Sequence, residues 1–487
     1  MPGGASSLGI NVRMNSHLQE PDFCVLSRLN TPTTPRSPAL ALAVVGLGSS
    51  IGPLDFSVTV AFPAITTAFG LATSDIRWVA VWYVLSYGSL MLAFGALGDR
   101  IGHLRVFRLG LILSLVSYTF SALAPSYHWL LATRVLQGVA VALTLSCGPA
   151  LAIALFDERM RTRALSGYAG MASLAGVIAP ILGGAGVALL GWPGVFWFRV
   201  PVVLLALACL PLLGAELGRV SGKQRLPFDL AGAALLSAGV AMFLLLPALL
   251  PGLLAVPVAL AGALLMRLLV ARQRASATPF LPHAVVRDSH FIIANLASVV
   301  VQFASFTVPL IVPFYLTRIA ACGPFATGAL LAVWAIGGML GSSFASRVIY
   351  RRGARRTAFA AGMVVIIGLL GVACWPDTTH YPFVVGCLLV QGVGIGLFQV
   401  AYTDLVVAAL PPSARGVAGS LTMVTRTVGI VCGASAWIWM LLALEGVGVA
   451  AGVAADHAFV LAFDRVVLSA VAVASLFFAV THRRWRD

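Results

Sequence analysis

The stretch Gly95-Ala-Leu-Gly-Asp99-Arg100-Ile-Gly102-His-Leu-Arg105 decides how this chain folds. It is a short polar turn between two apolar runs, 76–97 and 106–124, and each run is long enough to cross a bilayer. Its glycines allow two helices to turn tightly and to pack closely. One acid and two arginines place fixed charges at a helix end, beside the lipid surface. A turn of this kind is typical of a protein that crosses the membrane several times.

The composition of the chain excludes an ordinary soluble protein. Of its 487 residues, 60% are hydrophobic and 10% are charged, and the mean hydropathy is +0.99. Soluble domains carry about 25% charged residues. A soluble protein of this length could not hide so much apolar surface, so most of the chain is expected to face lipid or other membrane helices.

The charge pattern and the chemistry-bearing residues exclude further classes. A net charge of +15 would suggest nucleic acid in a soluble domain, but the basic residues occur in short clusters between apolar runs. We therefore expect the lipid bilayer as their partner, and no nucleic acid. The seven Cys form no C-x-x-C pair, the eight His show no metal-ligand spacing, and no Walker loop is present. We expect no metal, no cofactor and no enzymatic activity. The acid rings or carbonyl filter motifs of a channel are not visible either.

Fourteen apolar segments follow a polar stretch, residues 1–38, which is rich in Pro, Ser and Thr and is expected to be a disordered cytoplasmic tail. Each segment is near or above the roughly 20 residues that a membrane-spanning helix needs. The fold class is therefore an all-α membrane protein with 14 transmembrane helices. The expected spans are 39–65, 76–98, 105–124, 129–155, 163–190, 194–214, 230–249, 252–271, 290–316, 325–346, 357–375, 381–408, 415–444 and 458–480.

Basic residues predict the orientation of these spans. If the N-terminus is cytoplasmic, the inside segments hold all but six of the 31 Lys and Arg residues. This asymmetry places both termini in the cytoplasm. We expect a multi-pass protein of the plasma membrane, which in a bacterium is the inner membrane. The six arginines that lie elsewhere are Arg77, Arg134, Arg199, Arg318, Arg426 and Arg465.

The loop at 95–105 resembles the loop between the second and third spans of major facilitator superfamily transporters, whose pattern is G-x-L-x-D-R-x-G-R-[KR]. His103 and Leu104 replace the expected basic pair, and Arg105 follows directly. The resemblance implies that this loop is a conformational latch. Its residues here are Gly95, Asp99, Arg100, Gly102 and Arg105.

A weaker copy of the same loop follows the tenth span, at 341–356, without an acid at the position of Asp99. A worn second copy of a six-helix half would leave such a pattern. The resemblance therefore implies the major facilitator fold, which consists of two six-helix bundles with two inserted central helices. The expected divisions are 39–214 for the first bundle, 215–289 for a linker with the two extra spans, 290–480 for the second bundle and 481–487 for a cytoplasmic tail.

Asp55 and Arg134 are charged residues inside apolar spans of the first half. Asp55 is mid-span, where a carboxylate costs several kcal/mol unless it is protonated, paired or hydrated, and this suits a proton carrier. Arg134 lies early in the fourth span and cannot shed its charge, so it needs a carboxylate, carbonyl groups or water. The rise per residue places both at similar depth, which allows them to pair. A purely structural ion pair, or an acid that caps a Gly-Pro kink, remains the alternative.

Four segments resemble motifs of fourteen-span drug:proton antiporters. The stretch around Asp55 resembles L-D-x-T-[VI]-[VI]-N-[VI]-A-L-P with one residue fewer before the proline, and the segment at 134–138 resembles R-x-x-Q-G, which the family links to proton coupling. The segment at 176–184 resembles G-x-x-x-G-P-x-x-G-G and implies export. Further on, 191–201 resembles the pattern W-R-W-x-F-x-x-N-x-P that begins the sixth span. The kink motif consists of Gly176, Pro180, Gly183 and Gly184.

The leading hypothesis is a proton-coupled exporter of small amphipathic compounds or drugs that works by alternating access, as a monomer. The alternative is an importer or exporter of one specific metabolite in the same superfamily. The remaining polar and aromatic groups within spans are candidates for the substrate cavity, although interhelical hydrogen bonding and packing are their plainer roles. These candidates are Trp82, Tyr83, Tyr87, Gln137, Gln302, Gln391, Gln399 and Arg426.

Overall fold

A computed structural model describes residues 38–154, 161–211, 255–275, 288–375, 380–409 and 415–485, together with scattered positions between 235 and 245. These residues form helices and turns, and none of them is in a strand. Helices are the structure that apolar segments adopt in lipid, because each backbone group then finds its hydrogen bond inside the segment.

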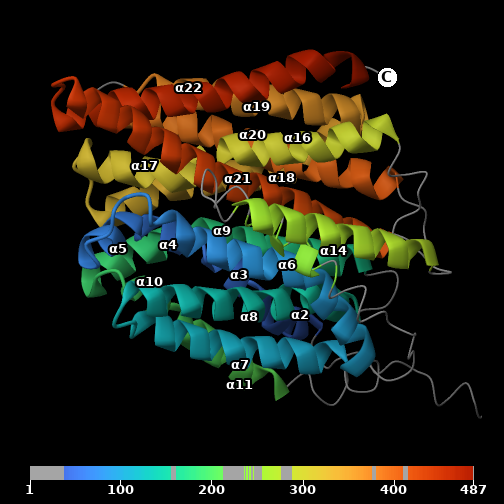
Figure 1. The fold of residues 1–487 in the computed structure, drawn as a ribbon. Helices are drawn as coiled ribbons and strands as arrows, with labels where there is room; N and C mark the ends of the chain where they lie inside the picture. The colour runs from blue at the N-terminus through green and yellow to red at the C-terminus, as the bar shows by residue number, and fades with distance from the viewer. Residues whose placement is uncertain are drawn as a thin grey trace, which may run out of the picture.

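The helices of the first half run from residue 38 to residue 209 and lie together in one part of the molecule, the lower part of Figure 1. The first expected span is divided into four short helices, and α6 is bent by 49° between Arg77–Met91 and Ala93–Ile101. The elements are α2 (Pro38–Ser49), α3 (Ile51–Leu54), α4 (Ser57–Val60), α5 (Phe62–Ala68), α6 (Arg77–Ile101), α7 (His103–Ala122), α8 (Tyr127–Ala154), α9 (Arg161–Leu190), α10 (Gly194–Trp197) and α11 (Arg199–Cys209).

The helices after residue 288 form the upper part of Figure 1. The ninth expected span is divided at Phe306 into α16 and α17. The elements of the remaining chain are α14 (Ala255–Ala275), α16 (Ser289–Ser305), α17 (Thr307–Arg318), α18 (Pro324–Arg352), α19 (Ala354–Ala373), α20 (Tyr381–Ala409), α21 (Arg415–Ala450), α22 (Ala455–Thr481) and the short 3-10 helix η4 (His482–Trp485).

Within the described residues, 10 helices are long and apolar enough to cross a membrane, and α6 is an eleventh if its two bent parts count as one span. The helix pair α10 and α11 covers the sixth expected span, and α14 covers the second inserted one. The first inserted span, 230–249, falls largely outside the described residues. The count of fourteen therefore stays a prediction, whereas the all-α membrane architecture is observed.

Large apolar side chains on the outer faces of the helices are exposed. Leu189 is 82% exposed, Val480 74% and Leu476 66%. Water would penalise such surface, whereas lipid tails solvate it at no cost. These faces are therefore the lipid-contacting surface of a membrane protein.

The latch loop and its second copy share one backbone conformation. Gly102 joins α6 to α7 with φ 102° and ψ 127°, and Gly353 joins α18 to α19 with φ 79° and ψ 156°. Both glycines lie in the positive-φ region, where a side chain would be strained. The internal repeat that the sequence suggested is thus present in the geometry of the two turns.

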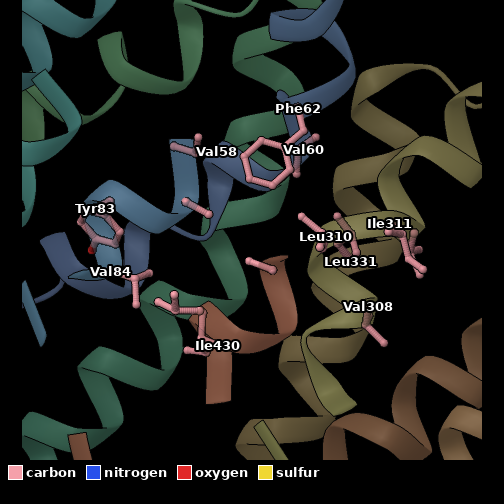
Figure 2. Close-up of a cluster of buried hydrophobic side chains, with 14 of the residues drawn as sticks. Val58, Val60, Phe62, Tyr83, Val84, Val308, Leu310, Ile311, Leu331 and Ile430 are labelled. Atoms are coloured by element: carbon pink, nitrogen blue, oxygen red, sulfur yellow. The ribbon is translucent and has the colours of Figure 1, made fainter. Parts of the chain in front are cut away.

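The two halves meet along α9 with α18 and along α6 with α21. The buried apolar side chains of α6 and α21 belong to one continuous cluster with Val187 of α9 and Leu331 of α18, whereas Ala175 and Ala179 of α9 belong to a second cluster. Figure 2 shows Ile430 of α21 lying near Val84 of α6, while Leu310 and Leu331 lie on the neighbouring second-half helices. A continuous apolar contact fixes how the halves sit relative to each other and encloses the polar groups described next.

Candidate functional site: a carboxylate between two arginines

Asp55 lies at a break in the first span. It follows α3, and its backbone N–H donates to the carbonyl of Gly52 at 3.0 Å. The next bonds are again of the i to i+3 type, with Val58 N–H donating to the carbonyl of Asp55 at 3.0 Å. Pro53 and the tight turns keep the chain from continuing as a regular α-helix. The break leaves the Asp55 side chain inside the first bundle, where the residue is 8% exposed.

Both oxygens of the Asp55 carboxylate accept charge-assisted hydrogen bonds. Arg134 of α8 donates from its two terminal nitrogens to Oδ1 at 2.7 Å and to Oδ2 at 2.8 Å. Gln137, one turn further along α8, donates to Oδ1 at 2.7 Å. Arg199, at the start of α11, donates to the same oxygen at 2.9 Å. The bidentate pairing with Arg134 is the strongest geometry available to a carboxylate.

Both arginines have further partners that do not depend on Asp55. Arg134 donates from Nε to the carbonyl of Val79 at 2.9 Å and from Nη1 to Oε1 of Gln137 at 2.7 Å. Its guanidinium lies over the ring of Tyr83, 4.3 Å from the centroid. These acceptors and the aromatic face stabilise a cation that has been removed from water.

Arg199 is held in a similar way by groups around it. It also donates to the hydroxyl of Ser57, and its guanidinium lies 5.2 Å from the ring centroid of Tyr118. Aromatic rings at positions 196 and 198 surround it further. Arg134 is 1% exposed and Arg199 is not exposed at all. We call Asp55, Arg134, Gln137 and Arg199 the carboxylate cage.

The cage carries one negative and two positive charges, so its net charge is +1. The hydrogen-bond pattern fits an ionised carboxylate, because both oxygens face guanidinium donors and Oδ1 accepts from three nitrogens. Removing one partner from a buried charge pair costs about 3–5 kcal/mol. A change in the charge of Asp55 therefore alters the ion pairs of both α8 and α11.

The pairing of Asp55 with Arg134 and Gln137 is the contact that the depth argument allowed. The role of Arg199 was not expected, because the sequence placed it only within the start of the sixth span. A signal was present: Arg199 stands where the resembling pattern has Asn. A charged residue in place of a neutral one, inside an apolar run, points to a buried counter-ion.

The kink motif on α9 connects the cage to the other half. A Cβ built on Gly183 would lie 2.7 Å from Cβ of Ser57, the residue that accepts from Arg199. A Cβ on the next residue, Gly184, would lie 2.5 Å from the carbonyl oxygen of Pro324 in α18. In return, a Cβ on Gly328 of α18 would overlap the carbonyl oxygen of Pro180. Adjacent glycines thus contact the cage on one side and the second half on the other.

Gly176, the first residue of the kink motif, behaves differently. A Cβ built there would meet nothing within 4 Å. Its place in the motif is not explained by a close backbone approach in this conformation.

The latch residues lie at the turn between α6 and α7. Asp99 has a side chain that is 69% exposed, and His103 lies 3.1 Å from its Oδ1. Arg105 donates to the carbonyl of Ile101 at 3.5 Å, and Arg100 is exposed. The resemblance implies a partner for Asp99 around 414–419. Residue 414 and the side chains of 415–419 lie outside what the structure describes.

Of the aromatic cavity candidates of α6, Tyr83 and Tyr87 contact each other, whereas Trp82 stacks on Trp78. Tyr83 is 6% exposed and packs under Arg134, so it belongs with the carboxylate cage. Trp82 is half-buried and stacks on Trp78 with 5.9 Å between ring centroids. Tyr87 is also half-buried and contacts the ring of Tyr83 at 5.2 Å.

The glutamines of the second half form two groups. Gln391 is buried in α20 and accepts from the indole of Trp334 in α18. Gln302 donates to Gln399 at 3.1 Å and links α16 to α20. Arg426 of α21 is half-buried, and its Nε has no hydrogen-bond partner among the described residues.

A bundle of apolar helices in two repeated halves, with buried charges near their contact, defines a membrane transporter. The model of the Major Facilitator Superfamily matches residues 38–434. This chain belongs to that superfamily.

Relatives within the superfamily carry several transport functions in their names. A riboflavin transporter, RibZ, of Clostridioides difficile is 24% identical over 397 residues, which cover 81% of this chain and 86% of the relative. A methylenomycin A resistance protein of Bacillus subtilis is 29% identical and covers 80% of this chain and 85% of its own length. A multidrug efflux pump, LfrA, of Mycolicibacterium smegmatis is 27% identical and covers 83% and 81%.

Solved structures share the fold. A peptide transporter, POT, superposes with a TM-score of 0.69 at 14% identity and covers 91% of this chain and 95% of its own. A bacterial homologue of the human lysosomal transporter Spinster, in an inward-facing and unoccupied conformation, superposes with a TM-score of 0.62 at 18% identity and covers 92% and 97%. At these identities the likeness establishes the architecture alone.

Proposed function

We propose that this protein is a proton-coupled exporter of small amphipathic compounds, and that Asp55 carries the proton. The carboxylate cage is the observation that carries the proposal. A buried carboxylate whose counter-ions come from α8 and α11 is a group whose protonation changes the packing of several helices.

The two arginines have other acceptors, and these lower the free-energy cost of neutralising the Asp55 carboxylate. When a proton neutralises the carboxylate, Arg134 keeps its bonds to Val79 and Gln137, and Arg199 keeps its bond to Ser57. Neither guanidinium is then left without an acceptor, which would cost several kcal/mol in a dry interior. The carboxylate releases the proton when the cage closes around it again.

Two neighbours of Asp55 couple this change to the contact between halves. Phe56 stacks on Trp334 of α18 with ring centroids 5.0 Å apart. Ser57 packs against Gly183, beside the contact of Gly184 with Pro324. A shift of the chain at 55–57 on protonation therefore reaches both contacts with α18. This linkage supports alternating access driven by protons entering the cell.

Several parts of the proposal rest on the sequence. The distribution of basic residues supports cytoplasmic termini and a plasma-membrane location, the inner membrane in a bacterium. The bundles would span 39–214 and 290–480, with 215–289 between them, and the protein would work as a monomer. Relatives named for resistance and efflux support export, whereas the riboflavin transporter keeps a single-metabolite substrate as the alternative.

Accumulation in intact cells tests direction and energy source together. Cells that express the protein and control cells are loaded with a panel of neutral, anionic and cationic amphipathic dyes and with riboflavin. At least one compound should accumulate less in the expressing cells, and a protonophore should erase the difference. Efflux that persists without a proton gradient while ATP is intact, or uptake in place of efflux, would overturn the proposal.

A further inference from the structure

Arg426 occupies the face of α21 between two contacts. Gly429 packs on α16, since a Cβ there would lie 2.5 Å from the carbonyl oxygen of Val299, and Thr427 packs on α6 against Gly88. Successive residues of an α-helix are ~100° apart, so the direction of Arg426 falls between these two. It therefore faces the space that separates α16 of the second half from α6 of the first half.

A wall of polar side chains adjoins this position. Tyr402 of α20 donates to the amide oxygen of Asn295 at 2.9 Å and shares a hydrogen bond of 2.7 Å with Thr425, the neighbour of Arg426. Gln302 lies against Gly429, one turn from Arg426, and donates to Gln399 at 3.1 Å. Tyr402 and Gln302 thus bring hydrogen-bonding groups of α20 and α16 to Thr425, the residue before Arg426, and to Gly429, one turn after it.

The polar wall borders an open cavity of about 340 Å³. Gln399 belongs to both the wall and the cavity. The other lining residues are Val400, Thr403, Asp404 and Val407. Apolar and polar groups in one open hollow suit a compound with both kinds of surface.

Arg426 and Asp404 differ in how far their charged groups are removed from water. Arg426 is half-buried, its Nε is desolvated, and it makes no ion pair with the residues that the structure describes. Asp404 is exposed and keeps its water. A buried N–H of a cation that has no acceptor is destabilising, whereas a hydrated carboxylate has lost little of its solvation. The carboxylate cage of the other half adds a further net positive charge.

We propose that Arg426 binds the acidic group of the transported compound, which makes the substrate class an amphipathic organic anion such as an aryl carboxylate. The planar guanidinium pairs with a carboxylate through two parallel hydrogen bonds. Arg426 does not line the cavity itself, and the apolar body of the compound would extend from it past Gln302 and Gln399 toward the valines of the cavity. This inference rests on the proposed transport function and assigns the charge of its substrate.

Equilibrium binding of three matched probes tests the assignment without any proton gradient. The full-length protein in nanodiscs of zwitterionic lipid is titrated at pH 7 with 2-naphthoate, 2-naphthamide and 2-naphthylmethylammonium. The anion should bind at least about tenfold tighter than the amide. A difference in affinity of this size is expected from one bidentate charge-assisted pair. Arg426→Gln should bring the two to within about twofold, and Arg426→Lys should keep part of the preference.

Arg465→Gln is the matched control, because it removes an exposed arginine from α22 and should leave the preference for the anion unchanged. Tighter binding of the cation, no binding of any probe, or an unchanged preference in Arg426→Gln would overturn the inference. The wild-type comparison needs no variant, so a poorly folded mutant does not decide the result. Loss of proton coupling with the anion preference intact would instead count against the proposed function alone.

Discussion

Arg199 donates to Asp55 at 2.9 Å although 144 residues separate the two in the chain. The contact closes the first bundle, because it joins the break in the first span to the start of α11. It also makes the site a cage with two cations and one acid, rather than a neutral pair. The predictions below follow from this excess of charge and from the close contacts around it.

Replacing Asp55 by Asn should abolish proton release that is driven by substrate. The amide keeps the shape of the side chain but is neither protonated nor deprotonated near neutral pH. Everted vesicles with a pH-sensitive dye, and any compound that the wild type exports, provide the measurement. Asp456→Asn is the control, since it makes the same change at a carboxylate whose side chain is 73% exposed and lies outside the cage. Proton release at the wild-type level in Asp55→Asn would move proton coupling to another residue.

The charge balance of the cage predicts an order of stability. Asp55→Asn leaves two buried cations without an acid and should destabilise the protein, by less than the about 3–5 kcal/mol of a fully unpaired buried charge, because each guanidinium keeps another acceptor. Arg199→Gln leaves a neutral Asp55–Arg134 pair and should cost much less. The double variant should recover part of the loss, because it again has only one excess cation. Thermal unfolding in one detergent measures the order, and a double variant less stable than Asp55→Asn would contradict it.

Gly184 and Gly176 form a matched pair for testing the contact between halves. A methyl group on Gly184 would meet the backbone of Pro324 at 2.5 Å, whereas one on Gly176 would meet nothing within 4 Å. Gly184→Ala should therefore lower the transport rate at least about tenfold by holding α9 and α18 apart, and Gly176→Ala should transport nearly normally. Initial rates are compared at equal protein level. Equal rates for the two variants would show that this close approach is not needed in the cycle.

Asp99 is expected to act on the conformational change and not on binding. Its exposed carboxylate lies beside His103, far along α6 from Tyr83, whose ring packs against Arg134 of the cage. Asp99→Asn should reduce the rate of transport severely while the dissociation constant of an exported compound stays within a few-fold of the wild type. Asp99→Glu, which keeps the charge, is the control. A large selective loss of binding with normal turnover at saturation would refute the latch role.

The main features of the fold were predictable from local sequence. Apolar length set the spans, because the bilayer has a fixed thickness, and the positive-φ turn at Gly102 followed from the glycine itself. Breaks within spans were less predictable. The sequence indicated one helix over 39–65, but the chain is divided into α2, α3, α4 and α5, because serine and threonine side chains and prolines interrupt the backbone hydrogen bonds.

The site was only half predictable, for a physical reason. A charge in an apolar span is costly wherever the helix sits, so the sequence alone singled out Asp55 and Arg134. Which cations surround the acid depends on how the spans pack. Arg199 in place of Asn indicated a buried charge, but not its contact with Asp55. Likewise, adjacent Gly183 and Gly184 are equivalent in the sequence, yet one packs on Ser57 and the other on Pro324. The cost of a buried charge is a property of the residue, whereas its partner is decided by helix packing.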